Sequence, residues 1–482
     1  MKQLSNSSLF RQQNFVNGKW INADNKKTIA VFNPFDQQQL GTIPECGAEE
    51  TARAIAAADA AWKPWRELTA LQRAELMWRW AALIDKNKED LAVLMTLEQG
   101  KPITESRGEI EYGNAFIKWF GEEARRVYGD VIPSNKGGQH LVVIKQPVGV
   151  VGAITPWNFP MAMITRKCAP ALAAGCPVVL KPATKTPFSA LALAVLAEEA
   201  GFPAGVINVV TGQAEAIGGE LSSNPLVRKI SFTGSTAVGK LLMKQCSSTL
   251  KKISLELGGN APFIVFDDAD LDAAVLGAIA SKFRNTGQTC VCANRILVQD
   301  SIYDEFTKKL IVAVKALKLG NGMDKDVQQG PLINEKALVK VKDHIADAVS
   351  KGAKIILGGQ PSAIGKLFFE PTILTDANST MRIAKEETFG PVAPLFRFKT
   401  EEQAIQMAND TEVGLASYFY SRDIHRVWRV SEALEYGMVG VNAGIVSTEV
   451  APFGGIKESG MGREGSKYGM DEYLEIKYLC MS

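Results

Sequence analysis

Short apolar, β-branched runs alternate with helical patterns from about residue 148 onward. The runs are GVVGAIT, PVVLK, GVINVV, RKISFT and KISLEL, and the helical segments between them include FPMAMITRKCAPALAAG and PFSALALAVLAEEAG. Strands that alternate with helices in this way are typical of a parallel, doubly wound sheet. Pro160 and Pro187 fit the first turns of two helices, with Thr186 as a cap, and Gly175 and Gly201 fit the helix ends.

A second alternation begins after Gly258. It predicts strands at PFIVF, RILVQ, KIILGG, GLASYFYS and GMVGVNAG, with helices near 270–286, 302–318 and 335–351. The amphipathic stretch near 49–127 has a mostly helical pattern, and we expect it to cover one face of the first sheet. The pattern therefore predicts an α/β fold with two doubly wound domains.

The composition restricts the class of partner. Apolar residues make up 46% of the chain, but no apolar run reaches the roughly 18 residues that a membrane-spanning helix needs. Basic residues exceed acidic ones by only two, without a basic stripe, which favours neither nucleic acid nor a membrane surface. We expect a small-molecule partner. The N-terminus lacks an apolar signal core and the seven cysteines are scattered, so the expected location is the reducing cytoplasm.

The stretch NTGQTCVCANR places Cys290 and Cys292 one residue apart. No metal is expected there, because the chain has no second cysteine pair and its histidines are few and far apart. The polar approach RNTGQT places the pair at a loop rather than in a core helix, so a thiol here is a candidate nucleophile. Packing remains the alternative for either cysteine, and spacing alone does not choose between them.

Two glycine-rich stretches are candidate phosphate loops. SGMGREG matches G-x-G-x-x-G formally, but no buried strand precedes it, and we reject it. GSTAVGK resembles a P-loop but has Leu241 where a Mg²⁺-binding hydroxyl belongs, which disfavours an ATPase. Gly234 and Gly239 still follow a strand and open a helix whose first N–H groups could face a pyrophosphate. An ordinary glycine turn is the alternative.

Two polar residues stand at predicted strand ends. In TPWNFP, the flanking prolines keep Asn158 in an extended loop, where its amide could donate to a developing oxyanion or serve as a structural turn residue. In KISLELGGNAP, Glu256 alternates with apolar residues. It is either a solvated strand residue or a catalytic carboxylate held over a cleft.

These stretches occur in order with several others. TPWNFP, LKPA, FTGSTAVG, LELGGNAP, GQTCVCANR, EETFGPV and PFGGIKESGMGREGSKYG have the order and spacing of the aldehyde dehydrogenase superfamily, which the chain resembles over essentially its whole length. Within the superfamily, the tail GREGSKYGMDEYLEIKY is similar to that of the bacterial, NADP-using succinate-semialdehyde dehydrogenases. The resemblance implies oxidation of succinate semialdehyde to succinate with reduction of NADP, in 4-aminobutyrate degradation.

The resemblance also implies catalytic roles. Cys290 would be the nucleophile, Glu256 the general base, and Asn158 with the backbone N–H of Cys290 the oxyanion hole. The thiolate would add to the aldehyde to form a thiohemiacetal, and the later thioester would be hydrolysed by water that Glu256 activates. A reversible disulfide between Cys290 and Cys292 is a further implication, although a bridge across one residue is strained and Cys292 could simply pack. A thiol esterase, which needs no dinucleotide, is the rival class.

Position 184 bears on the choice of cofactor. Relatives that prefer NAD typically carry Glu at this position, which repels a 2′-phosphate, whereas this chain has Thr184 followed by Lys185. We therefore expect NADP, with NAD used weakly. The cofactor-binding residues that the resemblance implies are Trp157, Lys181, Thr184, Lys185, Gly234, Ser235, Gly239, Leu257, Glu387 and Phe389.

The closer resemblance implies that Arg166, Arg284 and Ser447 hold a distal carboxylate of the substrate. A guanidinium pairs with a carboxylate through two hydrogen bonds, but either arginine could instead be a solvated helix residue. Glutarate semialdehyde is an alternative substrate, because one methylene is worth only about 1–3 kcal/mol in a pocket.

The resemblance assigns the strand-like segment QHLVVIKQPVGV and the C-terminal tail to subunit contact, in a homotetramer or a dimer. The expected organisation is two Rossmann-like α/β domains plus a small β oligomerisation domain. The expected bounds are 1–127 and 148–257 for the dinucleotide-binding domain, 258–457 for the catalytic domain with its nucleophilic cysteine, and 128–147 and 458–482 for the oligomerisation segments.

Overall fold

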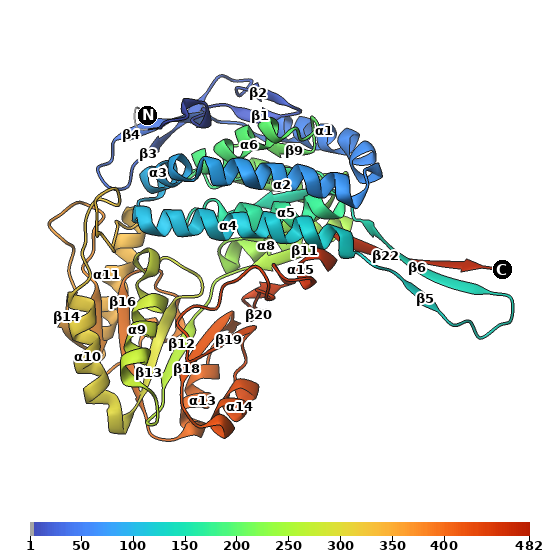
Figure 1. The fold of residues 1–482 in the computed structure, drawn as a ribbon. Coiled ribbons are helices and arrows are strands. Elements are labelled where there is room, and N and C mark those ends of the chain that lie inside the picture. Colours follow the sequence, from blue (N-terminus) through green and yellow to red (C-terminus); the bar gives the residue numbers. More distant parts are fainter. Residues whose placement is uncertain (1–3) are drawn as a thin grey trace.

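A computed structural model describes residues 4–482, which form two large sheets and a long β arm that leaves the body on one side (Figure 1). The first sheet lies in the upper half of that view and has eight strands. In spatial order they are β2 (Lys19–Ile21), β1 (Asn14–Val16), β9 (Ile207–Val209), β8 (Val178–Lys181), β7 (Val150–Ile154), β10 (Val227–Thr233), β11 (Lys252–Glu256) and β21 (Gly460–Met461).

The five central strands, from β9 to β11, are parallel. The chain runs from β7 through β8 to β9 on one side and then continues with β10 and β11 on the other, so the strand order reverses between β7 and β10. Doubly wound sheets bind ligands at this reversal, outside the carboxyl ends of the strands. Residues 155–161 and 234–235 leave these two ends, and both loops contain residues of the predicted site.

Helices cover both faces of the first sheet. Val151, Val178 and Leu180 pack with one group of helices, whereas Val150 and Val179 pack with the other, as the strand alternation requires. The expectation that the segment near 49–127 covers one face holds only in part for its first helix, α1. Its residues Ala54, Ile55 and Ala58 pack in the second group, whereas Ala61 and Trp65 pack in the first. The first group is α2 (Ala70–Lys86), α3 (Lys88–Gln99), α4 (Ile103–Glu123), α5 (Ala162–Ala174) and α6 (Phe188–Ala200); the second is α1 (Ala48–Glu67), α7 (Ala214–Ser223) and α8 (Thr236–Cys246).

The starts of α5 and α6 differ from the sequence prediction. Thr186 does not cap α6; Pro187 occupies the N-cap position, and the Thr186 hydroxyl donates to the Trp157 carbonyl instead. A buried carboxylate from α3, Glu98, accepts the first N–H groups of α6 at 2.7 and 2.8 Å. Helix α5 likewise begins after Met161, not at Pro160, and receives a carboxylate from α4. Both helices end as predicted, with Gly175 and Gly201 in the left-handed region.

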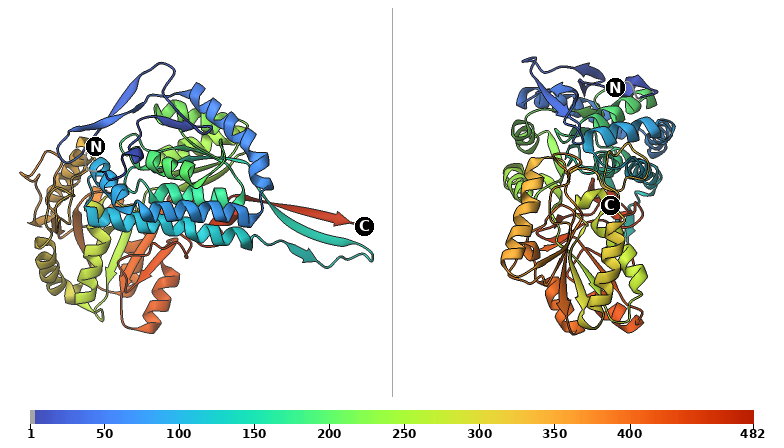
Figure 2. Two further views of the ribbon diagram at one scale, coloured as in Figure 1. Left: turned by 45° about the horizontal axis from the view of Figure 1, so that its top comes forward. Right: turned by 90° about the vertical axis from the view of Figure 1, so that its left-hand side faces the viewer.

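The second sheet has seven strands and helices on both sides (Figure 2). All neighbouring strands are parallel except β14 and β15. The strands are, in spatial order, β14 (Lys354–Leu357), β15 (Thr372–Thr375), β16 (Val392–Phe398), β13 (Ala293–Gln299), β12 (Ala261–Val265), β18 (Ala416–Tyr420) and β19 (Met438–Val441). The helices of this lobe are α9 (Leu271–Lys282), α10 (Tyr303–Lys315), α11 (Glu335–Ser350), α12 (Arg382–Lys385), α13 (Glu401–Asn409) and α14 (Ile424–Ala433).

The helix predicted near 270–286 ends four residues early, at Lys282. The chain then forms a 3₁₀ turn, η4 (Arg284–Gly287), in which Asn285 and Thr286 have φ values of +50° and +56°. The Asn285 N–H donates to the Glu105 carboxylate of α4 at 2.9 Å, so a contact with the other lobe holds this unusual backbone. The remaining 3₁₀ turns are η1 (Ser7–Leu9), η2 (Ala124–Arg126), η3 (Ser247–Thr249) and η5 (Asp300–Ile302).

The arm is a three-stranded antiparallel sheet of β5 (Asp130–Ile132), β6 (His140–Pro147) and β22 (Leu474–Met481). It unites parts of the two segments expected at the subunit contact. Between residues 458 and 473, however, β21 joins the first sheet and α15 (Tyr468–Asp471) packs on α5. Two small sheets complete the fold, β3 (Thr28–Phe32) with β4 (Gln39–Pro44) and β17 (Val413–Gly414) with β20 (Ile456–Lys457). No helix within residues 4–482 is long and apolar enough to cross a membrane.

Candidate active site

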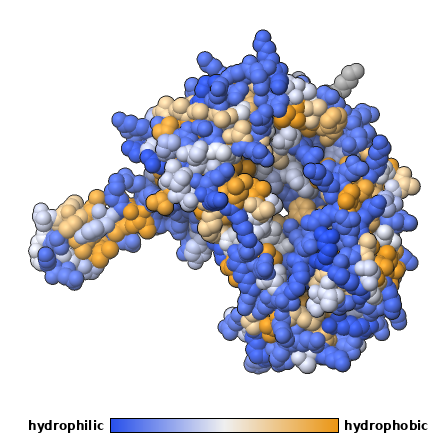
Figure 3. All heavy atoms as spheres, turned by 180° about the vertical axis from the view of Figure 1, so that it is seen from behind, coloured by the Kyte–Doolittle hydropathy of each residue, from blue (hydrophilic) through white to orange (hydrophobic). Residues whose placement is uncertain are grey.

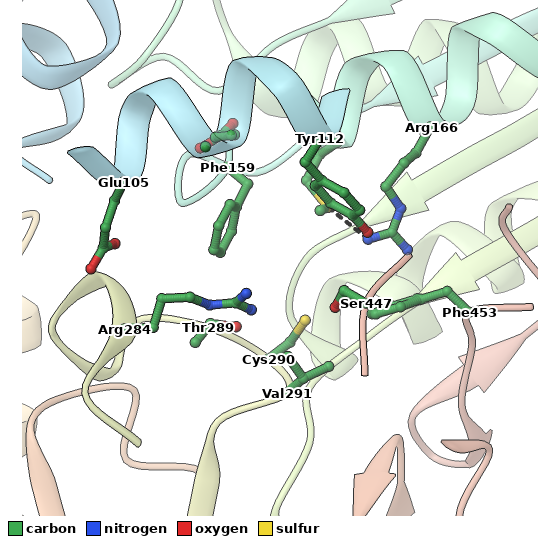
Figure 4. Close-up of a pocket in the computed structure, with 13 residues that line it drawn as sticks. Glu105, Tyr112, Phe159, Arg166, Arg284, Thr289, Cys290, Val291, Ser447 and Phe453 are labelled. Carbon is green, nitrogen blue, oxygen red and sulfur yellow. Dashed lines mark hydrogen bonds between the residues drawn. The ribbon is translucent and has the colours of Figure 1, made fainter. Parts of the chain in front are cut away.

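A cavity of about 290 Å³ lies where the lobes meet, between α4, the start of α5 and the segment that precedes β13. Figure 4 shows the Cys290 sulfur and the Arg284 guanidinium pointing into the same space. Acidic, cationic, hydroxyl and aromatic side chains share its wall. The lining residues are Glu105, Gly108, Glu109, Tyr112, Phe159, Met163, Arg166, Arg284, Thr289, Cys290, Val291, Ser447 and Phe453.

The geometry distinguishes the two neighbouring cysteines. Cys290 is half-buried and lines the cavity. Cys292 is 6% exposed, and its thiol donates to the Lys282 carbonyl at 3.2 Å. The position of Cys290 supports it as the nucleophile. Both thiols are free, and the disulfide between them stays a prediction.

The surroundings of Cys290 disfavour its thiolate. Burial, and after it the nearby Glu387 carboxylate, raise the pKa of the Cys290 thiol to about 12, although Arg166 and Arg284 act in the opposite direction. The thiol of the free protein is therefore protonated at neutral pH. Attack requires a proton acceptor or a change in the charges around the sulfur.

Asn158 is held by its side-chain amide and by its carbonyl. The amide Nδ2 donates to the Gln288 carbonyl at 3.1 Å, which uses one of its two N–H bonds and leaves the other for a ligand. Gln288 precedes the nucleophile by two residues, so this hydrogen bond ties the Asn158 amide to the Cys290 loop. The backbone N–H of Cys290 makes no hydrogen bond to any described residue. Both donors suit an oxyanion hole.

Glu256 ends β11 and is 3% exposed, so it is not the solvated strand residue of the alternative interpretation. Its Oε2 has no hydrogen-bond partner among the described residues. Burial raises the pKa of Glu256 well above the ordinary carboxyl value, and the neighbouring Glu464 raises it further. Room for the carboxylate comes from Gly454, where a Cβ would lie 3.0 Å from Glu256 Oε1.

Glu464 is the charged partner of two buried cations. Arg166 Nη2 lies 2.8 Å from Glu464 Oε2, and Lys167 pairs with Oε1. Burial acts to raise the pKa of Glu464, but Lys167 and Arg166 outweigh it and the pKa is lowered. Glu464 therefore stays ionised, and its charge helps to keep a proton on Glu256.

Several predicted cofactor residues lie at or just beyond the carboxyl ends of strands β8, β10 and β11, whereas the cleft lined by Thr184 and Lys185 contains none of the other predicted cofactor residues. Lys181 ends β8, and its ammonium donates to the Pro182 carbonyl; burial lowers the pKa of Lys181 to about 8. Thr184 and Lys185 line a cleft of about 880 Å³. Ser235 caps α8 directly after β10, as the strand–turn–helix pattern predicts. Gly239 packs against Leu257, where a Cβ would approach Leu257 Cδ2 to 2.5 Å.

Trp157, Phe389 and Glu387 form a second group of predicted cofactor residues, of which Glu387 lies close enough to Cys290 to raise the pKa of its thiol. The two aromatic rings meet edge to face at 5.5 Å. Glu387 Oε1 accepts from the Gly259 N–H at 3.3 Å, and burial raises the pKa of this carboxyl to about 7. The ammonium, hydroxyl and helix N–H donors of the first group fit the phosphates of a dinucleotide. The carboxylate and aromatic rings of the second group fit its nicotinamide ribose.

The two predicted substrate arginines differ in their surroundings. Arg166 lines the cavity but is paired with Glu464, and its guanidinium lies 3.8 Å from the Phe453 ring centroid. Arg284 is half-buried and makes no hydrogen bond or ion pair with any described residue. Ser447 lies on the same wall. Arg284 is therefore the cation available to an anionic ligand.

Several residues of the site carry no local sequence signal. Tyr112 reaches the cavity from α4, and its hydroxyl has no hydrogen-bond partner among the described residues. Lys101, Glu105 and Glu109 also come from the α3–α4 region, far from the quoted motifs. Glu464 lies inside the glycine-rich stretch rejected as a phosphate loop, and the motif comparison included it without giving it a role.

Comparison with known proteins agrees with this arrangement. Residues 20–479 match the model of the aldehyde dehydrogenase family. The chain belongs to the aldehyde dehydrogenase family. The predicted superfamily, fold class and NAD(P)-dependent aldehyde dehydrogenase class are thereby confirmed.

Individual relatives match over the whole length. The chain is 63% identical to a glutarate-semialdehyde dehydrogenase of Pseudomonas aeruginosa, over 99% of each chain. It is 62% identical to an NADP-dependent succinate-semialdehyde dehydrogenase of Escherichia coli, again over 99% of each. The crystal structure of an Escherichia coli NADP-dependent enzyme superimposes with a TM-score of 0.99 at 62% identity and covers 100% of both chains.

Proposed function

We propose that this aldehyde dehydrogenase oxidises succinate semialdehyde to succinate and reduces NADP. The observation that carries the proposal is a thiol, Cys290, and an unpaired guanidinium, Arg284, in one cavity of about 290 Å³. Such a pair suits an aldehyde with an anionic group at its far end. The named activities of the two relatives support it, because both semialdehydes carry a carboxylate.

The side chains have distinct tasks in this reaction. The Cys290 thiol first gives its proton to a base. Its sulfur then bonds to the aldehyde carbon, and the resulting oxyanion accepts from the Asn158 amide and the Cys290 N–H. NADP, when bound, supplies the acceptor for the hydride that leaves this carbon. Glu256 then takes a proton from water, whose oxygen attacks the thioester and releases succinate and the thiol. A thiol esterase would share these groups but would not need the predicted dinucleotide residues.

The first test concerns the cofactor and the nucleophile. We expect fast formation of reduced nicotinamide from succinate semialdehyde with NADP, slower formation with NAD, and none in Cys290→Ala. Thr184→Glu should lower kcat/KM for NADP by about tenfold or more and spare NAD, because a carboxylate repels the 2′-phosphate. Initial rates at 340 nm measure both. A parent enzyme that prefers NAD would contradict the role of Thr184, and an active Cys290→Ala would contradict the nucleophile.

A second test concerns the anion-binding role of Arg284. Arg284→Gln should raise KM for succinate semialdehyde about 10- to 100-fold, since a hydrogen bond to a charged group contributes roughly 1.5–3 kcal/mol. Butanal, which lacks the carboxylate, reports any general effect on Cys290. We divide kcat/KM for succinate semialdehyde by kcat/KM for butanal. This ratio should fall in Arg284→Gln and stay unchanged in Arg422→Gln, an exposed control. Equal losses for both aldehydes would exclude the anion contact.

A third test concerns the protonation of Glu256. The base must be ionised to accept a proton, and burial with the Glu464 charge raises the pKa of Glu256. We therefore expect kcat to rise with pH, with an apparent pKa above that of an ordinary carboxyl group. Glu256→Gln should lose about 10²- to 10⁴-fold in kcat and accumulate a thioester on Cys290, detectable by intact-mass spectrometry. Glu305→Gln, exposed on α10, is the control. Full activity of Glu256→Gln would exclude this role.

Glutarate semialdehyde is the second candidate substrate, favoured by the relative from Pseudomonas aeruginosa. It is one methylene longer, which a pocket distinguishes by only about 1–3 kcal/mol. The kcat/KM values of the two semialdehydes, measured under identical conditions, decide between them. If succinate semialdehyde is the better substrate, the enzyme fits a role in 4-aminobutyrate degradation. Growth of a deletion strain on 4-aminobutyrate tests this role, and we expect growth to be lost.

A homotetramer built through the arm is the proposed assembly. Large apolar side chains are exposed along the arm, including Val131 at 80% and Ile476 at 73%, and Figure 3 shows apolar atoms along its length. Exposed apolar surface of this extent marks a contact region. We expect a tetramer in analytical ultracentrifugation, and smaller species for Ile476→Asp but not for Lys315→Asp on α10. An unchanged mass for Ile476→Asp would place the contact elsewhere.

A further inference from the structure

Lys101 is a buried cation in the short connection between α3 and α4. It is 2% exposed, and Glu109 of α4 is its ion-pair partner. Removing an ammonium from water costs several kcal/mol unless charged and polar partners replace the lost water. The second partner is the carbonyl oxygen of Asn158, at 2.7 Å. The ammonium also lies 4.0 Å from the centroid of the Phe159 ring. Through these contacts the Lys101 ammonium binds the loop between β7 and α5.

Glu109 binds the other end of the same loop. Its Oε1 accepts from the N–H groups of Met161 and Ala162, at 2.9 and 3.1 Å, while Oε2 contacts Lys101. The Lys101–Glu109 pair therefore contacts the backbone on both sides of Pro160. Since proline restricts the backbone conformation of the residue before it, little freedom remains between Asn158 and Ala162.

The Asn158 carbonyl has a second donor. Asn285 Nδ2 donates to it at 3.0 Å, from the turn that precedes the nucleophile. The Asn158 peptide is thus fixed by one lobe through Lys101 and by the other through Asn285. Its side-chain amide then reaches the Gln288 carbonyl and presents its remaining N–H. A donor of this kind works within a few tenths of an ångström, and a displacement of about 1 Å can cost roughly 10²-fold in rate.

We propose that Lys101 is a positioning residue for the oxyanion hole: its ammonium, with Glu109, fixes the backbone that carries the Asn158 amide. The inference rests on the proposed role of Asn158. Lys101 itself touches no reacting atom.

The test compares variants that keep the local charge balanced. In Lys101→Met/Glu109→Gln both charges are removed together, so no lone buried carboxylate is left. We expect kcat for aldehyde oxidation to fall about 10- to 100-fold, because the Asn158 amide loses its fixed position. Alkylation of Cys290 by iodoacetamide without cofactor, followed on the Cys290 peptide by mass spectrometry, should stay within about twofold of the parent, since this displacement forms no oxyanion.

The matched control is Lys88→Met/Glu111→Gln, which removes a more exposed lysine–glutamate ion pair between α3 and α4. A second variant, Lys101→Gln/Glu109→Gln, retains a donor that is one bond shorter than Nζ. Its kcat should lie between those of the parent and the Met variant, or, if the Met variant does not fold, between those of the parent and Asn158→Ala.

Two results would overturn the inference while Asn158→Ala is impaired. The first is a kcat equal to that of the parent in either folded Lys101 variant. The second is a rate of Cys290 alkylation that falls in proportion to kcat, because such a fall would mean that the whole cavity has loosened. Full activity of Asn158→Ala would remove both this inference and the proposed oxyanion hole.

Discussion

Burial of charge beside Cys290 is the constraint on which this site depends. Burial raises the pKa values of Cys290, Glu256 and Glu387, so ionisation is costly for the two groups proposed to carry the chemistry, Cys290 and Glu256, and for their neighbour Glu387. In the fold, fixed charged partners replace solvent and offset the cost of burying these charges. Arg166 and Lys167 surround Glu464, and a lysine–glutamate pair lies under the Asn158 loop. Low-dielectric surroundings strengthen the remaining electrostatic interactions, which is the condition an oxyanion hole needs.

The same constraint separates the roles of the two arginines. Arg166 is paired with Glu464 and packed against Phe453, so its charge is already balanced within the protein. A second anion would have to compete with a partner at 2.8 Å. Arg284 has no such partner among the described residues, and its charge remains available to the ligand. The family resemblance treats them as equals, whereas the structure favours Arg284 for direct contact and Arg166 for the electrostatics around Glu256 and Cys290.

Periodicity and motifs were sufficient for the architecture but not for these partners. Continuous apolar runs predict β7 and β8, as is typical of buried parallel strands, and alternating β-branched and polar residues predict β10 and β11. Cys290, Asn158 and Glu256 stand in recognisable stretches. The prediction failed where a distant carboxylate replaces local chemistry: Glu98 caps α6 in place of Thr186, and Glu109 caps α5. Such contacts join residues 50 or more positions apart, and no short-range pattern encodes them.

The ionisable groups around Cys290 influence one another's pKa values. Glu387 raises the pKa of Cys290, and Glu256 raises it as well, so a proton taken up by either carboxyl makes the thiolate easier to form. Glu464 in turn favours the protonated form of Glu256. A pH profile of the enzyme therefore reports the protonation of Cys290, Glu256 and Glu387 together, and the Glu464 charge favours the protonated form of Glu256.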